Sequence, residues 1–158
     1  MVIEIVCQNQ RETEAVAAGL AARASAGDLF ALSGDLGAGK STFARAFIRA
    51  ALSNPEAEVP SPTFTLVQSY AGPVDIHHTD LYRIKDPEDV YELGLDEDRD
   101  EAILLVEWPG NMPDDWQKGA LHIAFKREGV ATEAGDEARR LVFTGDSDRW
   151  QTLLEGLC

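Results

Sequence analysis

The stretch of sequence that decides the fold reads Gly34-Asp35-Leu36-Gly37-Ala38-Gly39-Lys40-Ser41. It matches the complete pattern G-x-x-x-x-G-K-[ST]. Glycines at its first, fourth and sixth positions let the backbone curl, so that successive N–H groups point inward. Such a ring of N–H groups, followed by a lysine and a hydroxyl residue, is suited to hold phosphate oxygens. The stretch therefore predicts a phosphate-binding loop.

The sequence on either side of this loop supports the same interpretation. Residues 29–33 form a short apolar run, as expected of a buried parallel strand. Beyond the loop, apolar residues recur at helical spacing over 43–52, and Asn54-Pro55 then ends the helix. A strand, a loop and a helix in this order are the context that a P-loop requires and that a chance glycine-rich turn lacks.

The residues of the loop have distinct predicted roles. Lys40 supplies a mobile positive charge for the β and γ phosphates of a nucleotide. Ser41 offers a hydroxyl to Mg²⁺, Thr42 contacts the α-phosphate, and the helix that starts near Lys40 adds its positive dipole end. The predicted nucleotide-binding residues here are Asp35, Leu36, Gly37, Ala38, Gly39, Lys40, Ser41 and Thr42.

The composition argues against several other functions. The chain has 158 residues, with 14 Lys+Arg against 28 Asp+Glu, a net charge of −14 and a pI near 4.5. This balance disfavours a large nucleic-acid face or an anionic membrane surface. No stretch approaches the ~18 apolar residues that span a bilayer, and no signal peptide is visible. Cys7 and Cys158 show no metal or redox spacing. We therefore expect a cytoplasmic protein with a single domain over 1–158.

Hydrophobic periodicity predicts the other elements of the fold. We expect further strands over 2–7, 64–70, 74–80, 103–106, 121–125 and 141–143. We expect further helices over 11–25, from 86 onward and over 146–157, with a mobile connection over 129–137. Together these elements predict an α/β fold: a P-loop NTPase-like domain with a mixed, mostly parallel sheet flanked by helices.

Two carboxylates stand where a P-loop needs partners for its metal. Asp80 ends the predicted strand 74–80, and Glu107 follows the apolar run 103–106. Ligands of open α/β sheets gather outside the carboxyl ends of the strands, and Mg²⁺ prefers one or two carboxylates together with phosphates and waters. Asp80 is predicted to be a metal-side ligand. Glu107 is predicted either to bind the metal or to orient the attacking water. The alternative for each is a surface acid in an acidic chain.

The sequence also indicates which nucleotide is bound. The guanine-reading signature [NT]-K-x-D is absent, so ATP is expected. Arg45 and Arg49 lie on the helix after the loop, where we expect them to be solvated rather than catalytic. No arginine-rich lid and no second substrate pocket is evident. Hydrolysis coupled to a partner is therefore favoured over phosphoryl transfer to a metabolite.

Four blocks of sequence occur together in one chain: Gly34–Thr42, Ser61-Pro62-Thr63-Phe64, His78-Thr79-Asp80-Leu81-Tyr82-Arg83 and Val106-Glu107-Trp108-Pro109. Their order and spacing resemble the TsaE (formerly YjeE) family of bacterial tRNA threonylcarbamoyladenosine biosynthesis ATPases. The resemblance runs from Thr13 to Pro109 and is weaker beyond. The P-loop by itself is unspecific, whereas the four blocks together in a chain of this length are highly specific.

The resemblance implies a P-loop domain with weak ATPase activity that uses ATP and Mg²⁺. It implies the partner proteins TsaB and TsaD. Together these proteins install a threonylcarbamoyl group on the adenosine next to the anticodon, in tRNAs that read codons starting with A. TsaD is the transferase. The ATPase is thus expected to meet tRNA only indirectly, through the complex, and to involve no membrane.

The resemblance also implies roles for the matching residues. The catalytic set is Lys40, Asp80 and Glu107, and the metal ligands are Ser41, Asp80 and Glu107. The stretch Ser61-Pro62-Thr63-Phe64 becomes a nucleotide-sensing switch loop, and Trp108 lies beside the site. Thr13 resembles a family threonine near the adenine. Arg139, from the part with the weaker match, also reaches the nucleotide.

Two other functions stay open, a small-molecule kinase on the same scaffold and a nucleotide switch that does not hydrolyse ATP. Simpler roles also stay open for individual residues. For His77 and His78 the simpler role is that of ordinary strand-end residues whose ring nitrogens are hydrogen-bonded. For Ser61–Phe64 it is that of a rigid loop that closes the sheet. Many relatives carry Thr in place of Ser41, but Ser keeps the hydroxyl that the metal needs.

Overall fold

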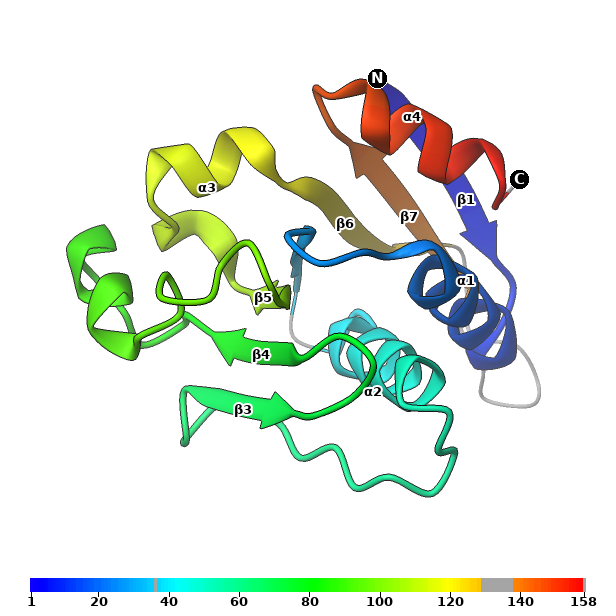
Figure 1. Ribbon diagram of the computed structural model, residues 1–158. Helices are drawn as coiled ribbons and strands as arrows, with labels where there is room; N and C mark the ends of the chain where they lie inside the picture. The colour runs from blue at the N-terminus through cyan, green and yellow to red at the C-terminus, as the bar shows by residue number, and fades with distance from the viewer. Residues whose placement is uncertain (36, 129–137, 158) are drawn as a thin grey trace.

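In the computed structural model, the chain forms a seven-stranded sheet flanked by helices (Figure 1). The structure describes residues 1–35, 37–128 and 138–157. The strands are β1 (Val2–Cys7), β2 (Leu29–Gly34), β3 (Val67–Tyr70), β4 (Ile76–Asp80), β5 (Ile103–Glu107), β6 (Leu121–Glu128) and β7 (Ala138–Thr144). The helices are α1 (Gln10–Arg23), α2 (Lys40–Ala51), α3 (Asp114–Gly119) and α4 (Asp148–Glu155), with the 3-10 helices η1 (Pro87–Leu93) and η2 (Pro109–Asn111).

The strands lie in the order β1-β7-β6-β2-β5-β4-β3. The central strands β6, β2, β5 and β4 pair in parallel, whereas β3 and β7 run antiparallel to their neighbours. Because β1 is antiparallel to β7, it points the same way as the central strands, so five of the seven strands share one direction. The prediction of a mixed, mostly parallel sheet flanked by helices is confirmed.

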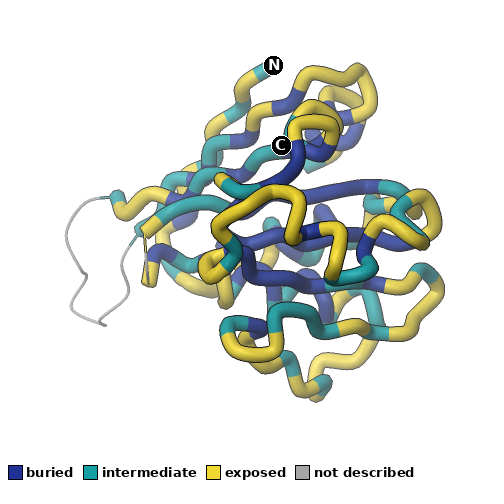
Figure 2. Tube along the Cα trace, turned by 90° about the vertical axis from the view of Figure 1, so that its left-hand side faces the viewer, coloured by how far each residue is buried: buried dark blue, intermediate teal, exposed yellow. Residues whose placement is uncertain are grey.

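Both faces of the sheet are covered, as the side chains of β2 show. Phe30 and Leu32 belong to the larger core, which includes residues of α1, α2 and α4. Leu29 and Ala31 belong to a smaller core that includes residues of η1 and α3. Alternate side chains of a strand point to opposite faces, so a strand covered on both sides reads as a continuous apolar run. Figure 2 shows buried strands through the middle of the molecule and exposed residues on the connecting segments.

The helices α1 and α2 lie side by side against the larger core (Figure 1). α1 begins after Asn9, whose side chain accepts a hydrogen bond from the N–H of Glu12 at 3.0 Å, as expected of an N-cap. α2 begins after Gly39, which has a φ of 113°. Both helices agree with the predicted ones within a few residues. None of the helices in the described ranges is long and apolar enough to cross a bilayer.

Some expected elements differ from the observed ones. The strand expected over 64–70 begins only at Val67, because Leu66 has a φ of 67° and its N–H donates to the carbonyl of Pro62 at 2.7 Å. The helix expected from 86 onward is the 3-10 helix η1. α3 and η2 were not predicted, since segments this short carry little periodicity. The connection expected over 129–137 lies outside the described residues.

Gly34 has a position that only glycine tolerates. Its φ is +141°, and a Cβ atom there would lie 2.6 Å from the backbone oxygen of Phe125 on β6. We expect Gly34→Ala to lower the free energy of unfolding by about 1–3 kcal/mol, measured by urea denaturation without nucleotide. Gly119→Ala is the control, because a Cβ at the end of α3 meets nothing within 4 Å. Wild-type stability in Gly34→Ala would contradict the assigned close approach.

Candidate nucleotide-binding site

The candidate site lies where three parallel strands end. Glu107, the last residue of β5, is in register with Leu32 of β2 on one side and with Asp80 of β4 on the other. The phosphate-binding loop starts at Gly34, where β2 ends. Residues in register on neighbouring strands point to the same face of a sheet. Leu105, one alternation before Glu107, packs in the larger core, so both carboxylates lie on the face that α2 covers.

A cavity of about 240 Å³ opens at this edge of the sheet. It brings together most of the predicted site residues, from the loop, α2, β4, β5 and β7. The lining residues are Gly37, Gly39, Lys40, Ser41, Thr42, Ser61, Thr63, Asp80, Glu107, Trp108 and Arg139. The cavity therefore combines a phosphate-binding loop with two carboxylates and two hydroxyl groups of the expected switch loop.

Lys40 is held inside the loop that it follows. Its Nζ donates to the backbone carbonyls of Gly34 at 2.5 Å and Asp35 at 3.1 Å, and lies 4.3 Å from the centre of the Trp108 ring. Burial lowers the pKa of the Lys40 ammonium, and the nearby carboxylates, Glu107 first among them, partly offset this effect. Among the described residues, the hydrogen bonds of this buried lysine go to neutral carbonyls, which it can exchange for anionic oxygens.

The two carboxylates are almost completely buried, with 4% of Asp80 and 3% of Glu107 exposed. The Oδ2 atom of Asp80 accepts a hydrogen bond from the hydroxyl of Thr63 at 3.1 Å, and its Oδ1 accepts one from the N–H of Tyr82 at 2.9 Å. Oε2 of Glu107 lies 2.6 Å from Nε2 of His78. Each acid is therefore oriented by a neighbouring residue.

The oxygen atoms that could act as metal ligands around the cavity are of the kind that a hard cation such as Mg²⁺ prefers. Asp80, Glu107 and the hydroxyl of Ser41 offer oxygen atoms only, which Mg²⁺ prefers. Within the described ranges, no group of three or more His, Cys, Asp or Glu side chains is arranged to hold a metal. An ion at this site would therefore need further oxygen ligands, and nucleotide phosphates are of the right kind.

Trp108 follows Glu107 in an unusual backbone conformation. Its φ of 55° and ψ of 60° place it in the left-handed region, which is costly for a residue with a bulky side chain. Its ring lies over the ammonium of Lys40 and 5.1 Å from the ring of Tyr82, centre to centre. The turn thus places the Trp108 ring directly beside the carboxylate and the lysine.

Arg139 reaches the loop from β7. Its Nε donates to the carbonyl of Ala38 at 2.9 Å, and its Nη2 donates to the carbonyl of Gly37 at 3.3 Å. These bonds fix the middle of the phosphate-binding loop and place a guanidinium at the cavity wall. That this arginine reaches a nucleotide stays a prediction.

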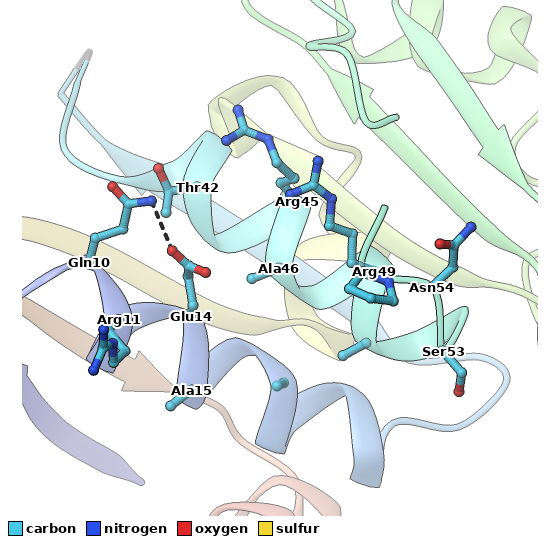
Figure 3. Close-up of a pocket in the computed structure, with 13 residues that line it drawn as sticks. Gln10, Arg11, Glu14, Ala15, Thr42, Arg45, Ala46, Arg49, Ser53 and Asn54 are labelled. Carbon is cyan, nitrogen blue, oxygen red and sulfur yellow. Dashed lines mark hydrogen bonds between the residues drawn. The ribbon is translucent and has the colours of Figure 1, made fainter. Parts of the chain in front are cut away.

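A second, larger hollow of about 620 Å³ lies between α1 and α2 (Figure 3). Thr42 lines both this groove and the smaller cavity. Small side chains such as Ala15 and Ala46 lie between the helices, and the side chains of Arg45 and Arg49 project from α2 (Figure 3). The groove extends the site along the face of the two helices.

Other predicted residues lie away from the cavity or outside the described chain. Thr13 is buried on α1, and its hydroxyl faces the carbonyl of Asn9 at 3.5 Å, so it lines neither hollow. Leu36 is outside the described residues. In the expected switch loop, Pro62 is buried whereas Phe64 is 80% exposed. The nucleotide role of Thr13 stays a prediction.

The two neighbouring histidines have different surroundings. His77 shares hydrogen bonds with Ser69 at 2.8 Å and with Asp98 at 2.8 Å, on the face away from the cavity. His78 instead faces Glu107. Sequence reasoning left both roles open and missed this bond. The one signal in the sequence was strand alternation, because side chains two residues apart share a face and His78 therefore shares the face of Asp80.

Together, the sheet order, the loop at the end of β2 and the carboxylates on the adjacent strands define a P-loop NTPase-like fold. The crystal structure of Bacillus subtilis YdiB superposes with a TM-score of 0.75 at 32% sequence identity, covering 99% of this chain and 94% of that one. The likeness therefore includes nearly the whole of both structures.

Sequence comparison gives the family. The family model described as "Threonylcarbamoyl adenosine biosynthesis protein TsaE" matches residues 7–137. The tRNA threonylcarbamoyladenosine biosynthesis protein TsaE of Bacillus subtilis (strain 168) is 38% identical over 151 residues, covering 94% of this chain and 89% of its own. The protein of that name from Streptomyces coelicolor is 32% identical over 136 residues, covering 80% and 86%. The chain belongs to the TsaE family.

The buried ammonium of Lys40 gives a prediction about stability. Because burial lowers its pKa, the unfolded chain holds this proton more tightly than the folded one. At neutral pH the charged ammonium of Lys40 therefore lowers the free energy of unfolding. This destabilisation is lost only at high pH, as the pH rises through the pKa of Lys40 in the folded and then in the unfolded chain. We expect Lys40→Met to keep or raise the midpoint of thermal unfolding at pH 7.

The control for this prediction is Lys118→Met, at an exposed position in the last turn of α3, where we expect little change. A clear fall in the unfolding midpoint of Lys40→Met alone would show that the bonds from Lys40 to its loop outweigh the burial of its charge.

Proposed function

We propose that this protein binds ATP with Mg²⁺ and hydrolyses it weakly, in a manner dependent on partner proteins, during threonylcarbamoyladenosine modification of tRNA. The observation that carries this proposal is the single cavity in which Lys40, Asp80 and Glu107 converge behind a complete phosphate-binding loop. Membership of the TsaE family supports the pathway. The geometry of the phosphate-binding loop supports the binding of a nucleotide.

The phosphates would occupy the cavity in front of the loop. Backbone N–H groups of the loop and the N-terminus of α2 are suited to anionic oxygens. Lys40 would exchange its bonds to the carbonyls of Gly34 and Asp35 for bonds to the β and γ phosphates. This exchange compensates the buried ammonium with negative charge, so the lysine is better satisfied with the nucleotide than without it.

Mg²⁺ would be held by Ser41, Asp80 and Glu107, directly or through water, together with the phosphates. When bound, the ion neutralises charge that develops on the phosphates during hydrolysis. Glu107 would orient a water molecule toward the γ-phosphate, and the position of its carboxylate in the cavity wall at the end of β5 supports this role. Lys40 and the loop supply the remaining electrostatic stabilisation.

The nucleoside would extend beyond the smaller cavity. A hollow of about 240 Å³ is below the range of roughly 300–1,000 Å³ typical of ligand sites, so it has room for only part of the nucleotide. Thr42, the predicted α-phosphate contact, also lines the groove between α1 and α2 (Figure 3). Arg139 stands at the same wall.

The partners would sense the nucleotide through the loop Ser61–Phe64 and its surroundings. Phe64 is 80% exposed and Tyr82 is 65% exposed, and Arg83 lies over the Phe64 ring at 4.6 Å. Exposed aromatic and arginine side chains are typical of protein interfaces. TsaB and TsaD are the proposed partners, in the cytoplasm. They would hold the tRNA, because a chain with a net charge of −14 repels it.

Turnover with partners tests this proposal against the two alternatives. We expect ATP hydrolysis to be weak alone and to rise when purified TsaB and TsaD are added. Glu107→Gln should lower kcat by about 10² to 10⁴-fold, because an orienting or base residue contributes this much, while keeping ATP-analogue binding. Lys40→Met should lose binding of the analogue in calorimetry.

Each alternative predicts a different pattern in the same assay. A small-molecule kinase would release ADP in response to a metabolite mixture and ignore the partner proteins. A nucleotide switch would bind the ATP analogue yet release no phosphate, even with both partners present. An unchanged kcat in Glu107→Gln would move the catalytic role to Asp80 or to a partner.

Thr63 connects the expected switch loop to the metal side of the cavity. Its hydroxyl bonds to the Ser61 hydroxyl at 2.8 Å and donates to Asp80 at 3.1 Å. We expect Thr63→Ala to weaken the coupling between ATP and partner binding at least fivefold, the lower end of typical couplings. Its affinity for the ATP analogue should change less. Calorimetric titration of TsaB–TsaD with and without the analogue measures both quantities.

The control for this coupling is Thr65→Ala, two residues further along. The hydroxyl of Thr65 accepts a hydrogen bond from Gln68 at 2.9 Å and does not line the cavity. Equal losses of ATP affinity and coupling in Thr63→Ala would make this residue a simple ligand contact and remove it from the switch.

A further inference from the structure

The bond between His78 and Glu107 is buried beneath the cavity. Nε2 of His78 lies 2.6 Å from Oε2 of Glu107, and only 2% of His78 and 3% of Glu107 is exposed. His78 on β4 is in register with Leu105 on β5, so Glu107 is its diagonal neighbour toward the carboxyl end of the sheet. The imidazole thus reaches Glu107 from a position that does not line the cavity.

The polar groups of His78 define the direction of this bond. A carboxylate oxygen only accepts hydrogen bonds, so the proton lies on Nε2 of the imidazole. The other ring nitrogen, Nδ1, is buried and has no hydrogen-bond partner among the described residues. Among the described residues, Glu107 is therefore the only hydrogen-bond partner of the His78 ring. A histidine kept only as part of a structural network would be expected to use both nitrogens.

The neighbouring His77 provides the contrast. It lies one residue earlier on β4, so its side chain points to the opposite face. Both of its ring nitrogens are satisfied, by Ser69 and by Asp98, and neither group lines the cavity. The chain thus holds two adjacent histidine–carboxylate pairs, of which only one includes a residue of the candidate site.

We propose that His78 is a positioning residue that orients Glu107 for ATP hydrolysis. This inference rests on the proposed role of Glu107. The bond fixes Oε2 and restricts rotation of the carboxylate, so that the other oxygen faces the water or the ion. Misplacement of a reacting group by about 1 Å is enough to lower a rate by about 10²-fold. The histidine itself does not line the cavity.

Two amide substitutions separate positioning from packing. The side-chain NH₂ of glutamine can take the place of Nε2, whereas the shorter asparagine places its NH₂ near Nδ1. We expect His78→Asn to lower the partner-stimulated kcat by about 10- to 100-fold, as removal of a supporting hydrogen bond does at other sites. We expect His78→Gln to restore kcat to within a few-fold of the wild type.

In both variants the affinity for a non-hydrolysable ATP analogue should stay within about twofold of the wild type, since His78 does not line the cavity. The same two substitutions at His77 are the matched control, and we expect no difference in kcat between them. Equal activity of His78→Gln and His78→Asn would overturn the proposal, because it would assign the residue to packing alone.

A spectroscopic measurement tests the bond without turnover. In nucleotide-free protein labelled with ¹⁵N-histidine, we expect His78 to show its proton on Nε2, with the signal assigned by its loss in His78→Gln. Glu107→Ala should shift that signal and leave the His77 signal in place. A proton on Nδ1, or a signal that ignores Glu107→Ala, would overturn the proposal.

The wild type and Glu107→Gln distinguish failure of this inference from failure of the proposed function. If the wild type with its partners releases no phosphate, both the proposed function and the role of His78 fail. If the wild type is active and Glu107→Gln is not, the proposed function stands. The comparison of the two His78 variants then decides the inference by itself.

Discussion

The parallel pairing of β5 with β2 and β4 is the constraint on which the site depends. It places Glu107 between the strand that leads into the phosphate-binding loop and the strand that ends at Asp80. A slip of one residue would turn every side chain of β5 to the other face of the sheet. The alternating residues Leu104 and Leu105 belong to different cores, so such a slip would disrupt both. The packing that stabilises the sheet therefore also aligns the carboxylates.

The charged groups of the site are kept in place by hydrogen bonds to the protein's own polar groups. Lys40 is bonded to loop carbonyls, Asp80 is bonded to a threonine hydroxyl and a backbone N–H, and Glu107 is bonded to an imidazole. Each bond reduces the cost of burying a charge. The result is a cavity whose reactive groups are ordered before any ligand arrives, which lowers the reorganisation needed when charge develops there.

The parts of this arrangement that could be predicted are those written in local patterns. The loop motif, the apolar strand before it and the acids that end two strands indicated the fold class and the residues that line the cavity. Alternation along β4 puts His78 and not His77 on the face of Asp80, but the register that brings His78 next to Glu107 was not available from the sequence. The left-handed backbone at Trp108 and the turn at Leu66 were also missed, since neither residue is a glycine. Such positions are maintained by tertiary contacts rather than by local preference.

The bond from Arg139 to the phosphate-binding loop connects residues 101 positions apart in the chain. Arg139 belongs to β7, which follows the other six strands of the sheet in the chain, whereas the loop follows β2 directly. During translation, the loop is therefore complete in sequence long before the strand that supports it leaves the ribosome. A nascent chain can form β2 and α2 early, but this arginine joins the cavity only after β7 has been synthesised.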